Sequence, residues 1–242
     1  MQYHPLMGDK IRVALYDVNW GATCQQLQLN IWGQNNIIPL SFFSVAKRLG
    51  GVALVALAND ECVGFIISLP CVFNQQLSQW SFRLAVSNDY QNLGIGTLLK
   101  RQQQQQLLSQ GVQTLMWSFD PLNFKNAHLN LNKLKAKIVD FDAHMYASDA
   151  GQRCIVEWNL DGIPSTNFSQ LQSIQSITGD EVELLPSAEN THSLPDVIRV
   201  TLNHDSDVDK LTEQMNQLLM SGYVGVSFVE YQENGHYVFV KR

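Results

Sequence analysis

Hydrophobic and polar positions along the 242-residue chain follow two periods. Some segments repeat apolar residues at the spacing of a helix, whereas others have the short apolar or alternating runs of strands. The predicted helices are 23–32, 42–49, 96–110, 127–135 and 208–220. The predicted strands are 11–18, 52–58, 62–69, 80–86, 112–119, 153–160, 224–231 and 236–241, with one more near the start of 198–242. This mixture predicts an α/β fold around a central sheet.

A polar segment divides the predicted elements into two groups. Residues 161–176 are rich in Ser, Gln, Asn and Thr, which is typical of a linker or loop. We therefore expect a core over 1–160. A C-terminal extension over 161–242, with the order strand, helix, strand, strand, is expected to pack on the core or to complete it.

The segment from Leu84 to Gly96 runs from an apolar strand through a glycine loop into a helix. Glycines at 94 and 96 let backbone N–H groups approach a phosphate without interference from a Cβ atom. The start of the helix adds unpaired amides and the positive end of its dipole. The pattern therefore predicts a site for a pyrophosphate.

Two common phosphate-binding loops do not fit this segment. A dinucleotide fingerprint requires a third glycine where Leu99 stands and an acidic residue near 115–117, where the chain has Leu-Met-Trp. A nucleoside-triphosphate loop ends in Gly-Lys-Ser/Thr, whereas Gly96 is followed by Thr97 and Leu98. What remains is the pattern Gln-x-x-Gly-x-Gly at Gln91, Gly94 and Gly96.

This pattern resembles the coenzyme A pyrophosphate loop of the GNAT superfamily of N-acyltransferases. A wider resemblance, to a GNAT subfamily of predicted acetyltransferases with a C-terminal extension, covers almost the whole chain. It is carried by residues 27–33, 50–51, 63–65, 84–86, 117–122 and 126–130. Among these, Trp117-Ser118-Phe119-Asp120-Pro121-Leu122 is the most discriminating. The resemblance implies the GNAT fold, a mixed and mostly antiparallel sheet flanked by helices.

The resemblance also implies an acyl-CoA cosubstrate and the residues that bind it. The end of the strand before the loop would orient the thioester, and Asn126 and Asn130 would contact the pantetheine arm. The implied cofactor-binding residues are Leu84, Ala85, Val86, Gln91, Asn92, Leu93, Gly94, Ile95, Gly96, Thr97, Asn126 and Asn130.

Direct acyl transfer needs a neutral amine, a stabilised carbonyl oxygen and a proton for the leaving thiolate. By resemblance, Tyr146 is the candidate general acid. The general base stays open between Asp120, Glu157, His128 and a chain of waters, and Asp120 is retained as a candidate catalytic residue. No cysteine has a visible histidine partner for covalent catalysis, and lone histidines imply no metal.

Two positions are candidates for binding the acceptor, Arg83 and Trp32. The Arg83 guanidinium would match a substrate carboxylate, although a surface arginine at a strand edge explains it equally well. Here Ser81-Phe82-Arg83 replaces the subfamily's Ser-His and nonpolar residue, and Lys135 replaces the glycine of its Leu-Gly-Ala triplet. We expect acetyl or succinyl transfer to a small-molecule amine, with an amino acid as one candidate. The alternative is a catalytically degenerate sensor or scaffold that binds coenzyme A.

Charge and composition narrow the class of partner. The net charge is −6, but residues 80–137 hold seven Lys or Arg against Asp89 and Asp120, and residues 161–242 hold four against twelve acidic residues. A basic middle suits a phosphate-bearing small molecule better than a nucleic acid. We expect Gln102–Gln106 to be a solvated helix face. Without a membrane span or leader pattern, we expect a cytoplasmic protein with reduced, buried cysteines; a homodimer stays open.

Overall fold

The computed structural model describes residues 4–6, 9–146, 151–162, 197–202, 207–231 and 233–242. Most of the predicted linker over 161–176 lies outside the described residues. The chain divides into two compact units, Met1–Met116 and Trp117–Arg242. In the part of the chain that the structure describes, no helix is both long and apolar enough to cross a membrane.

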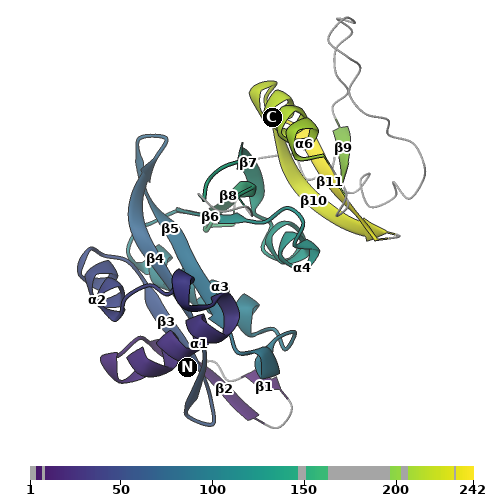
Figure 1. The fold of residues 1–242 in the computed structure, drawn as a ribbon. Coiled ribbons are helices and arrows are strands. Elements are labelled where there is room, and N and C mark those ends of the chain that lie inside the picture. Colours follow the sequence, from purple (N-terminus) through teal and green to yellow (C-terminus); the bar gives the residue numbers. More distant parts are fainter. Residues whose placement is uncertain (1–3, 7–8, 147–150, 163–196, 203–206, 232) are drawn as a thin grey trace, which may run out of the picture. The chain divides into compact units, whose positions relative to one another are not determined.

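The strands of the first unit form an antiparallel series in chain order. These strands are β1 (His4–Leu6), β2 (Asp9–Leu15), β3 (Ala53–Ala58), β4 (Glu61–Phe73) and β5 (Gln76–Val86) (Figure 1). The beginning of β6 (Thr114–Phe119) pairs with β5 in parallel, with Gln79 opposite Leu115. A mixed, mostly antiparallel sheet is therefore confirmed.

The hairpin of β4 and β5 is longer than the sequence pattern predicts. Beyond 62–69 and 80–86, the strands continue to a turn at Asn74 and Gln75, which have φ of 48° and 62°. Two left-handed residues give the turn that matches the twist of a hairpin. The added residues include the exposed pair Val72 and Leu77, which face no core and so give no burial pattern.

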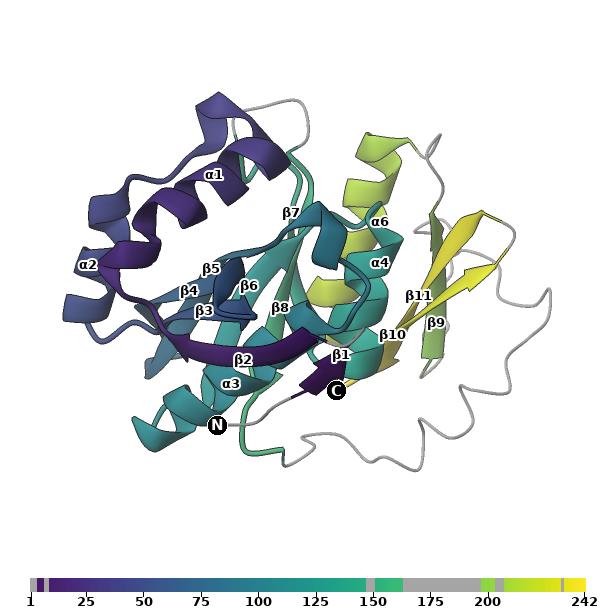
Figure 2. The ribbon, with the colours of Figure 1, turned by 90° about the horizontal axis from the view of Figure 1, so that it is seen from below.

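Helices cover both faces of this part of the sheet. Two helices, α1 (Gly21–Trp32) and α2 (Leu40–Arg48), pack on one face with the 3-10 turns η1 (Val18–Trp20) and η2 (Gln34–Asn36) beside them. The helix α3 (Ile95–Ser109) packs on the other face (Figure 2). Alternate strand residues such as Val55 and Phe65 bury against α1 and α2, because strand side chains point to opposite faces.

The described residues of the second unit form helices and five strands that lie wholly within it. The helices are α4 (Phe124–Ala127), the π-helix η4 (His128–Lys133) and α6 (Val208–Met220). The sheet order is β8 (Arg153–Asn159), β7 (Lys137–Asp142), β10 (Tyr223–Tyr231), β11 (Asn234–Lys241) and β9 (Val197–Leu202). Leu211, Met215 and Leu218 form the buried face of α6.

Several features of the structure bear on the sequence predictions. The helix predicted over 208–220 has these bounds, whereas β7 was not predicted because charged residues interrupt its apolar positions. The strand β10 of the extension pairs with β7, with Gly225 opposite Ile138. The domain boundary at 160 itself stays a prediction. The cysteines are free, as expected: Cys24, Cys62 and Cys154 are buried, and Cys71 is half-buried.

Candidate functional site

The loop after β5 is fastened to the end of that strand. The Ser87 N–H donates to the carbonyl oxygen of Val63 at 2.8 Å, and the 3-10 turn η3 (Asn88–Tyr90) follows. Gln91 Nε2 then donates to the carbonyl oxygen of Val86 at 3.2 Å and to Asn88 Oδ1 at 3.0 Å. The side chain of Gln91 thus fixes the shape of the loop, and its role toward a cofactor stays a prediction.

The loop enters α3 with its backbone amides unpaired within the helix. Asn92 and Gly94 have φ of 64° and 82°, and Gly94 is the N-cap without a side-chain capping bond. The first helical bond runs from the Leu98 N–H to Gly94 O at 2.9 Å. The N–H groups of Ile95 and Gly96 precede that bond, and no acidic side chain lies in the first turn.

Space around the two glycines fits a ligand that approaches the backbone. A Cβ atom at Gly96 would have Leu84 Cδ2 at 3.7 Å as its nearest neighbour, and one at Gly94 would have nothing within 4 Å. Packing within the protein therefore does not require glycine at 96. The positive φ explains Gly94, and close approach of an anion to the amides would explain Gly96. The residues present thus fit a pyrophosphate.

The remaining predicted cofactor residues of the first unit lie beside this loop. Ala85 and Val86 are buried, Leu84 is half-buried, and all three pair with β4. In the loop and first helical turn, Asn92 is exposed, Leu93 and Thr97 are half-buried and Ile95 is buried. The predicted residues from 84 to 97 therefore form one continuous strand end, loop and helix start.

A β-bulge at Phe82 directs three consecutive side chains of β5. The register steps from Ile67 opposite Arg83 to Ser68 opposite Ser81, so Phe82 is the extra residue. Ser81 Oγ donates to Gln103 Oε1 on α3 at 3.2 Å. A bulge places an additional residue on one strand and re-aims its neighbours, which lets both Phe82 and Arg83 reach the helices on the opposite face.

The structure brings the two candidate acceptor residues together. The Cζ atom of Arg83 lies 4.6 Å from the centre of the Trp32 ring and 5.8 Å from that of Phe82. The Phe82 ring in turn lies 5.0 Å from that of Phe42 on α2. Phe42 and Phe82 were missed by sequence reasoning, because their contact depends on the bulge register.

Lys100 and Gln103 correct two expectations about α3. Gln103 is fully buried, so the expectation that Gln102–Gln106 is a solvated face is wrong at its second residue. Lys100 is 3% exposed, and burial lowers its pKa well below the ordinary value. Lys100 therefore does not add a surface charge to the basic segment 80–137.

The predicted helix over 127–135 is a composite in the structure. Asn123 caps α4 by accepting from the Asn126 N–H at 3.1 Å. After Ala127 the chain widens into η4, and the Leu134 N–H donates to Leu129 O at 2.9 Å. Such π-helical turns have no distinct hydrophobic period, so the sequence indicates only a helix.

Asn126 and Asn130 differ in what they offer a ligand. Asn126 is half-buried in α4. Asn130 is buried, and its Oδ1 accepts from the indole Nε1 of Trp117 at 3.2 Å, a bond that does not use its NH₂ group; a role of that group toward a cofactor stays a prediction. The Trp117 ring meets that of Trp158 edge to face at 6.1 Å. Asn130 therefore also holds the end of β6.

Tyr146 lies with its hydroxyl beside Ser118 on β6. The two oxygens are 3.4 Å apart, and the Tyr146 side chain is 43% exposed. The Cζ atom of Arg153 lies 5.0 Å from the centre of the Tyr146 ring. Sequence reasoning missed Ser118 and Arg153 as neighbours of the candidate acid. The Trp-Ser/Thr-Phe-Asp motif around Ser118 was the available signal.

The candidate bases each have a different local role. Asp120 Oδ1 accepts from the Leu122 N–H at 2.8 Å and so stabilises the turn after β6. Glu157 stands opposite Lys137 across β8 and β7. His128 Nδ1 lies 3.0 Å from Asn132 Nδ2. Among the described residues, no cluster of three or more His, Cys, Asp or Glu is arranged to hold a metal.

Comparison with known proteins finds a family to which the first part of the chain is similar. Residues 15–130 match the family model described as the acetyltransferase (GNAT) family. No curated protein sequence matches the chain.

Solved structures share the fold at low sequence identity. An aminoglycoside 6'-acetyltransferase type Ii is 20% identical, with a TM-score of 0.51 over 64% of this chain and 99% of that one. An aminoglycoside 6'-N-acetyltransferase complexed with coenzyme A is 16% identical, with a TM-score of 0.50 over 64% and 99%. The ribosomal-protein-S18-alanine N-acetyltransferase of Escherichia coli is 16% identical, with a TM-score of 0.53 over 65% and 98%. These likenesses confirm the expected fold.

Proposed function

From the match of residues 15–130 to the acetyltransferase (GNAT) family, we propose that this chain is an N-acyltransferase of the GNAT superfamily and that it acylates the amine of a small molecule carrying a carboxylate. The family match supports acyl transfer in general. The observation that carries the proposal for this chain is the loop from Gln91 to Thr97, whose amides are open to an anion at the start of α3. The proposed donor is acetyl-CoA or succinyl-CoA.

The proposed cofactor contacts follow the chemistry of the described residues. Ile95, Gly96 and Thr97 would hold the pyrophosphate through backbone N–H groups and the positive end of the helix. The end of β5, with Ala85 and Val86, would orient the thioester. Asn126 and Asn130 would contact the pantetheine arm. Acyl-CoA, when bound, supplies the activated acyl group and a thiolate leaving group.

Tyr146 is proposed as the general acid for that leaving group. A phenol can donate its proton to a departing thiolate, and the hydroxyl of Ser118 at 3.4 Å would orient it. Direct transfer requires the acceptor amine to lose a proton. Asp120 is the proposed base among the three candidates because it follows β6 directly, in the turn after Phe119.

The acceptor is proposed to be recognised by Arg83 and Trp32. A guanidinium pairs with a carboxylate through two parallel N–H donors, and stacking on an indole fixes the plane of that fork. The neighbouring rings of Phe42 and Phe82 would contact an apolar part of the same substrate. An amino acid, or an amine of similar charge, has the chemistry that these side chains select.

Calorimetric titration with coenzyme A, acetyl-CoA and succinyl-CoA tests the cofactor proposal. Gly94→Asp adds a negative charge to the loop and should abolish binding. Gly111→Asp is the matched control, because Gly111 has φ of 77°, open space around it and a place at the other end of α3. No binding by the folded native chain, or equal loss in both variants, would reject the cofactor proposal.

Measuring the release of free coenzyme A distinguishes an active acyltransferase from a sensor that only binds coenzyme A. The native chain is incubated with the acyl-CoA that it binds and with amines that do or do not carry a carboxylate. Release that depends on a carboxylate-bearing amine supports the proposed acceptor class. Tight binding without release across the panel would favour the sensor.

A further inference from the structure

The segment from Pro121 to Lys133 has little support of its own for its conformation. The helix α4 comprises four residues, and the six residues of the π-helix η4 follow it. Short helices are marginal in water, because the first turn fixes many backbone dihedrals for few hydrogen bonds, and π-helical turns are rare. This segment therefore depends on contacts with other elements of the second unit.

Asn132 pairs with the backbone of β10 as a neighbouring strand would. Its Nδ2 donates to the carbonyl oxygen of Phe228 at 2.6 Å, and its Oδ1 accepts from the Phe228 N–H at 3.1 Å. The same Oδ1 accepts from the hydroxyl of Ser227 at 3.1 Å. The pairing between β10 and β7 is at Gly225 and Ile138, so Asn132 satisfies the backbone of β10 beyond it.

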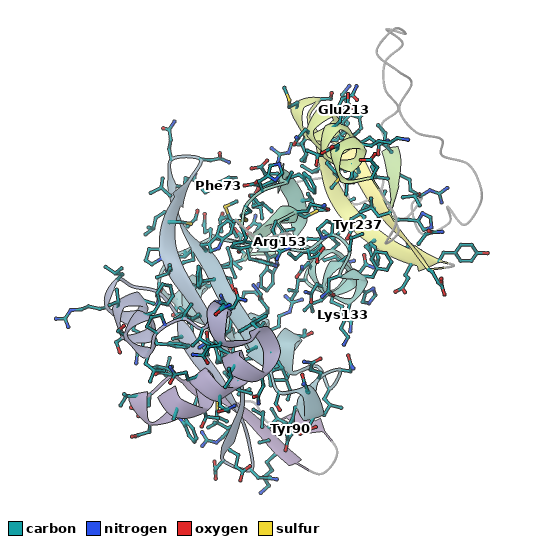
Figure 3. The ribbon with its side chains drawn as sticks, in the orientation of Figure 1. Phe73, Tyr90, Lys133, Arg153, Glu213 and Tyr237 are labelled. Carbon is teal, nitrogen blue, oxygen red and sulfur yellow. The ribbon has the colours of Figure 1, made fainter. Side chains whose placement is uncertain are left out.

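Aromatic residues hold the beginning of the same segment. The buried Tyr237 of β11 donates from its hydroxyl to the carbonyl oxygen of Pro121 at 2.5 Å. Burial, together with Cys154 and Asp120, raises the pKa of Tyr237, so its hydroxyl stays protonated and remains a hydrogen-bond donor. The Phe228 ring lies 4.9 Å from that of Tyr237 and 5.3 Å from that of Phe124. Tyr237 of β11 and Lys133, the last residue of η4, are labelled among the side chains in Figure 3.

The approach of β11 to this segment is close enough to require a glycine. A Cβ atom at Gly235 would lie 2.5 Å from Cε1 of Phe124 and 2.8 Å from Cε2 of Phe228. Real Cβ atoms do not approach ring carbons so closely, because dense interiors resist even one added methyl group. The hairpin of β10 and β11 is therefore in close contact with the segment 121–133.

We propose that the hairpin of β10 and β11 is a brace that sets the affinity for acyl-CoA by holding Pro121–Lys133 in place, with Asn132 and Tyr237 as positioning residues. The inference rests on the proposed function, because Asn126 and Asn130 lie on the braced segment. A segment ordered before binding loses less conformational entropy when the ligand arrives. The C-terminal extension is on this account part of the acyltransferase rather than a separate module.

Two variants each remove hydrogen bonds between the hairpin and the segment 121–133, and a third variant serves as the control. Asn132→Ala removes the paired amide, and Tyr237→Phe removes only one hydroxyl group. Glu230→Gln is the matched control, because Glu230 is exposed on β10. Hydrogen exchange of residues 121–134 is measured on the ligand-free full chain. The Kd for coenzyme A and the KM for the acceptor are measured on the same samples.

We expect both variants, but not the control, to exchange faster over 121–134 and to bind coenzyme A about tenfold more weakly, with the acceptor KM unchanged. Unchanged exchange would overturn the brace, and faster exchange with unchanged affinity would overturn its role in cofactor binding. If the native chain binds no coenzyme A, the proposed function fails along with that role. In that case the exchange data alone still show whether the hairpin stabilises residues 121–134.

Discussion

The guanidinium of Arg83 stacks on the ring of Trp32, with 4.6 Å between Cζ and the ring centre. Arg83 comes from β5 directly after the bulge at Phe82, and Trp32 is the last residue of α1. Both side chains are half-buried, so the Arg83 guanidinium is partly shielded from solvent but still accessible to it. The contact turns two separate sequence candidates into one group that can orient an anion.

Replacing Arg83 should weaken binding of the acceptor rather than binding of the cofactor. For Arg83→Gln we expect the KM of a carboxylate-bearing amine to rise about ten- to a hundredfold, because a charged hydrogen bond contributes about 1.5–3 kcal/mol. Steady-state kinetics with the same amine as its carboxamide provide the control. An equal loss for the acid and the carboxamide would contradict carboxylate recognition. Trp32→Leu should give a smaller loss of the same kind.

Removing the Tyr146 hydroxyl should slow the chemical step. In Tyr146→Phe we expect kcat to fall by about a hundredfold or more with little change in either KM, since general acids contribute at least that much. An acyl donor whose leaving thiol is more acidic should lose less, because its thiolate departs without a proton. Ser118→Ala serves as a milder companion variant. Unchanged kinetics in Tyr146→Phe would remove the acid role.

The buried Lys100 should make stability depend on pH. Because its folded pKa lies well below 10.5, the unfolded chain binds more protons between the two values, and stability rises with pH across that window. Lys100→Met should therefore be more stable than the native chain at pH 7, by at least about 1 kcal/mol. Denaturant unfolding should show this difference shrinking toward pH 10. A difference that is constant with pH would contradict the prediction.

Replacing Lys135 by glycine should make the protein more stable. Its φ is 61°, and its side chain is exposed, so it holds a left-handed conformation that disfavours a Cβ atom. This agrees with the glycine that the resembled subfamily has at the same place. Lys135→Gly should raise the free energy of unfolding by about 1 kcal/mol. Lys125→Gly, in the helical conformation of α4, should lower it by a similar amount.

Local patterns in the chain predicted the elements that depend on a few neighbouring residues. The loop chemistry follows from Gln91, Gly94 and Gly96, and the structure places them directly before and within the first turn of α3. The amphipathic period of α6 gave its bounds without reference to any partner. The acceptor amine, the oligomeric state and the cellular location stay predictions.

Other features had no local signal. The bulge at Phe82 depends on how β4 and β5 align, and a single strand does not reveal its own register. The burial of Gln103 within a run of glutamines depends on Ser81 of β5, which is distant in sequence and contacts the buried face of α3. The π-helical turn of η4 has the composition of an ordinary helix.

The sequence by itself determined the class of chemistry, because glycine spacing, strand end and helix start lie within one short stretch of backbone. Only the tertiary structure decided which distant side chains meet. Arg83 reaches Trp32, Ser118 reaches Tyr146 and Asn132 reaches Phe228 through strand register and helix packing. Such contacts form when the whole core excludes water, and no local propensity specifies them.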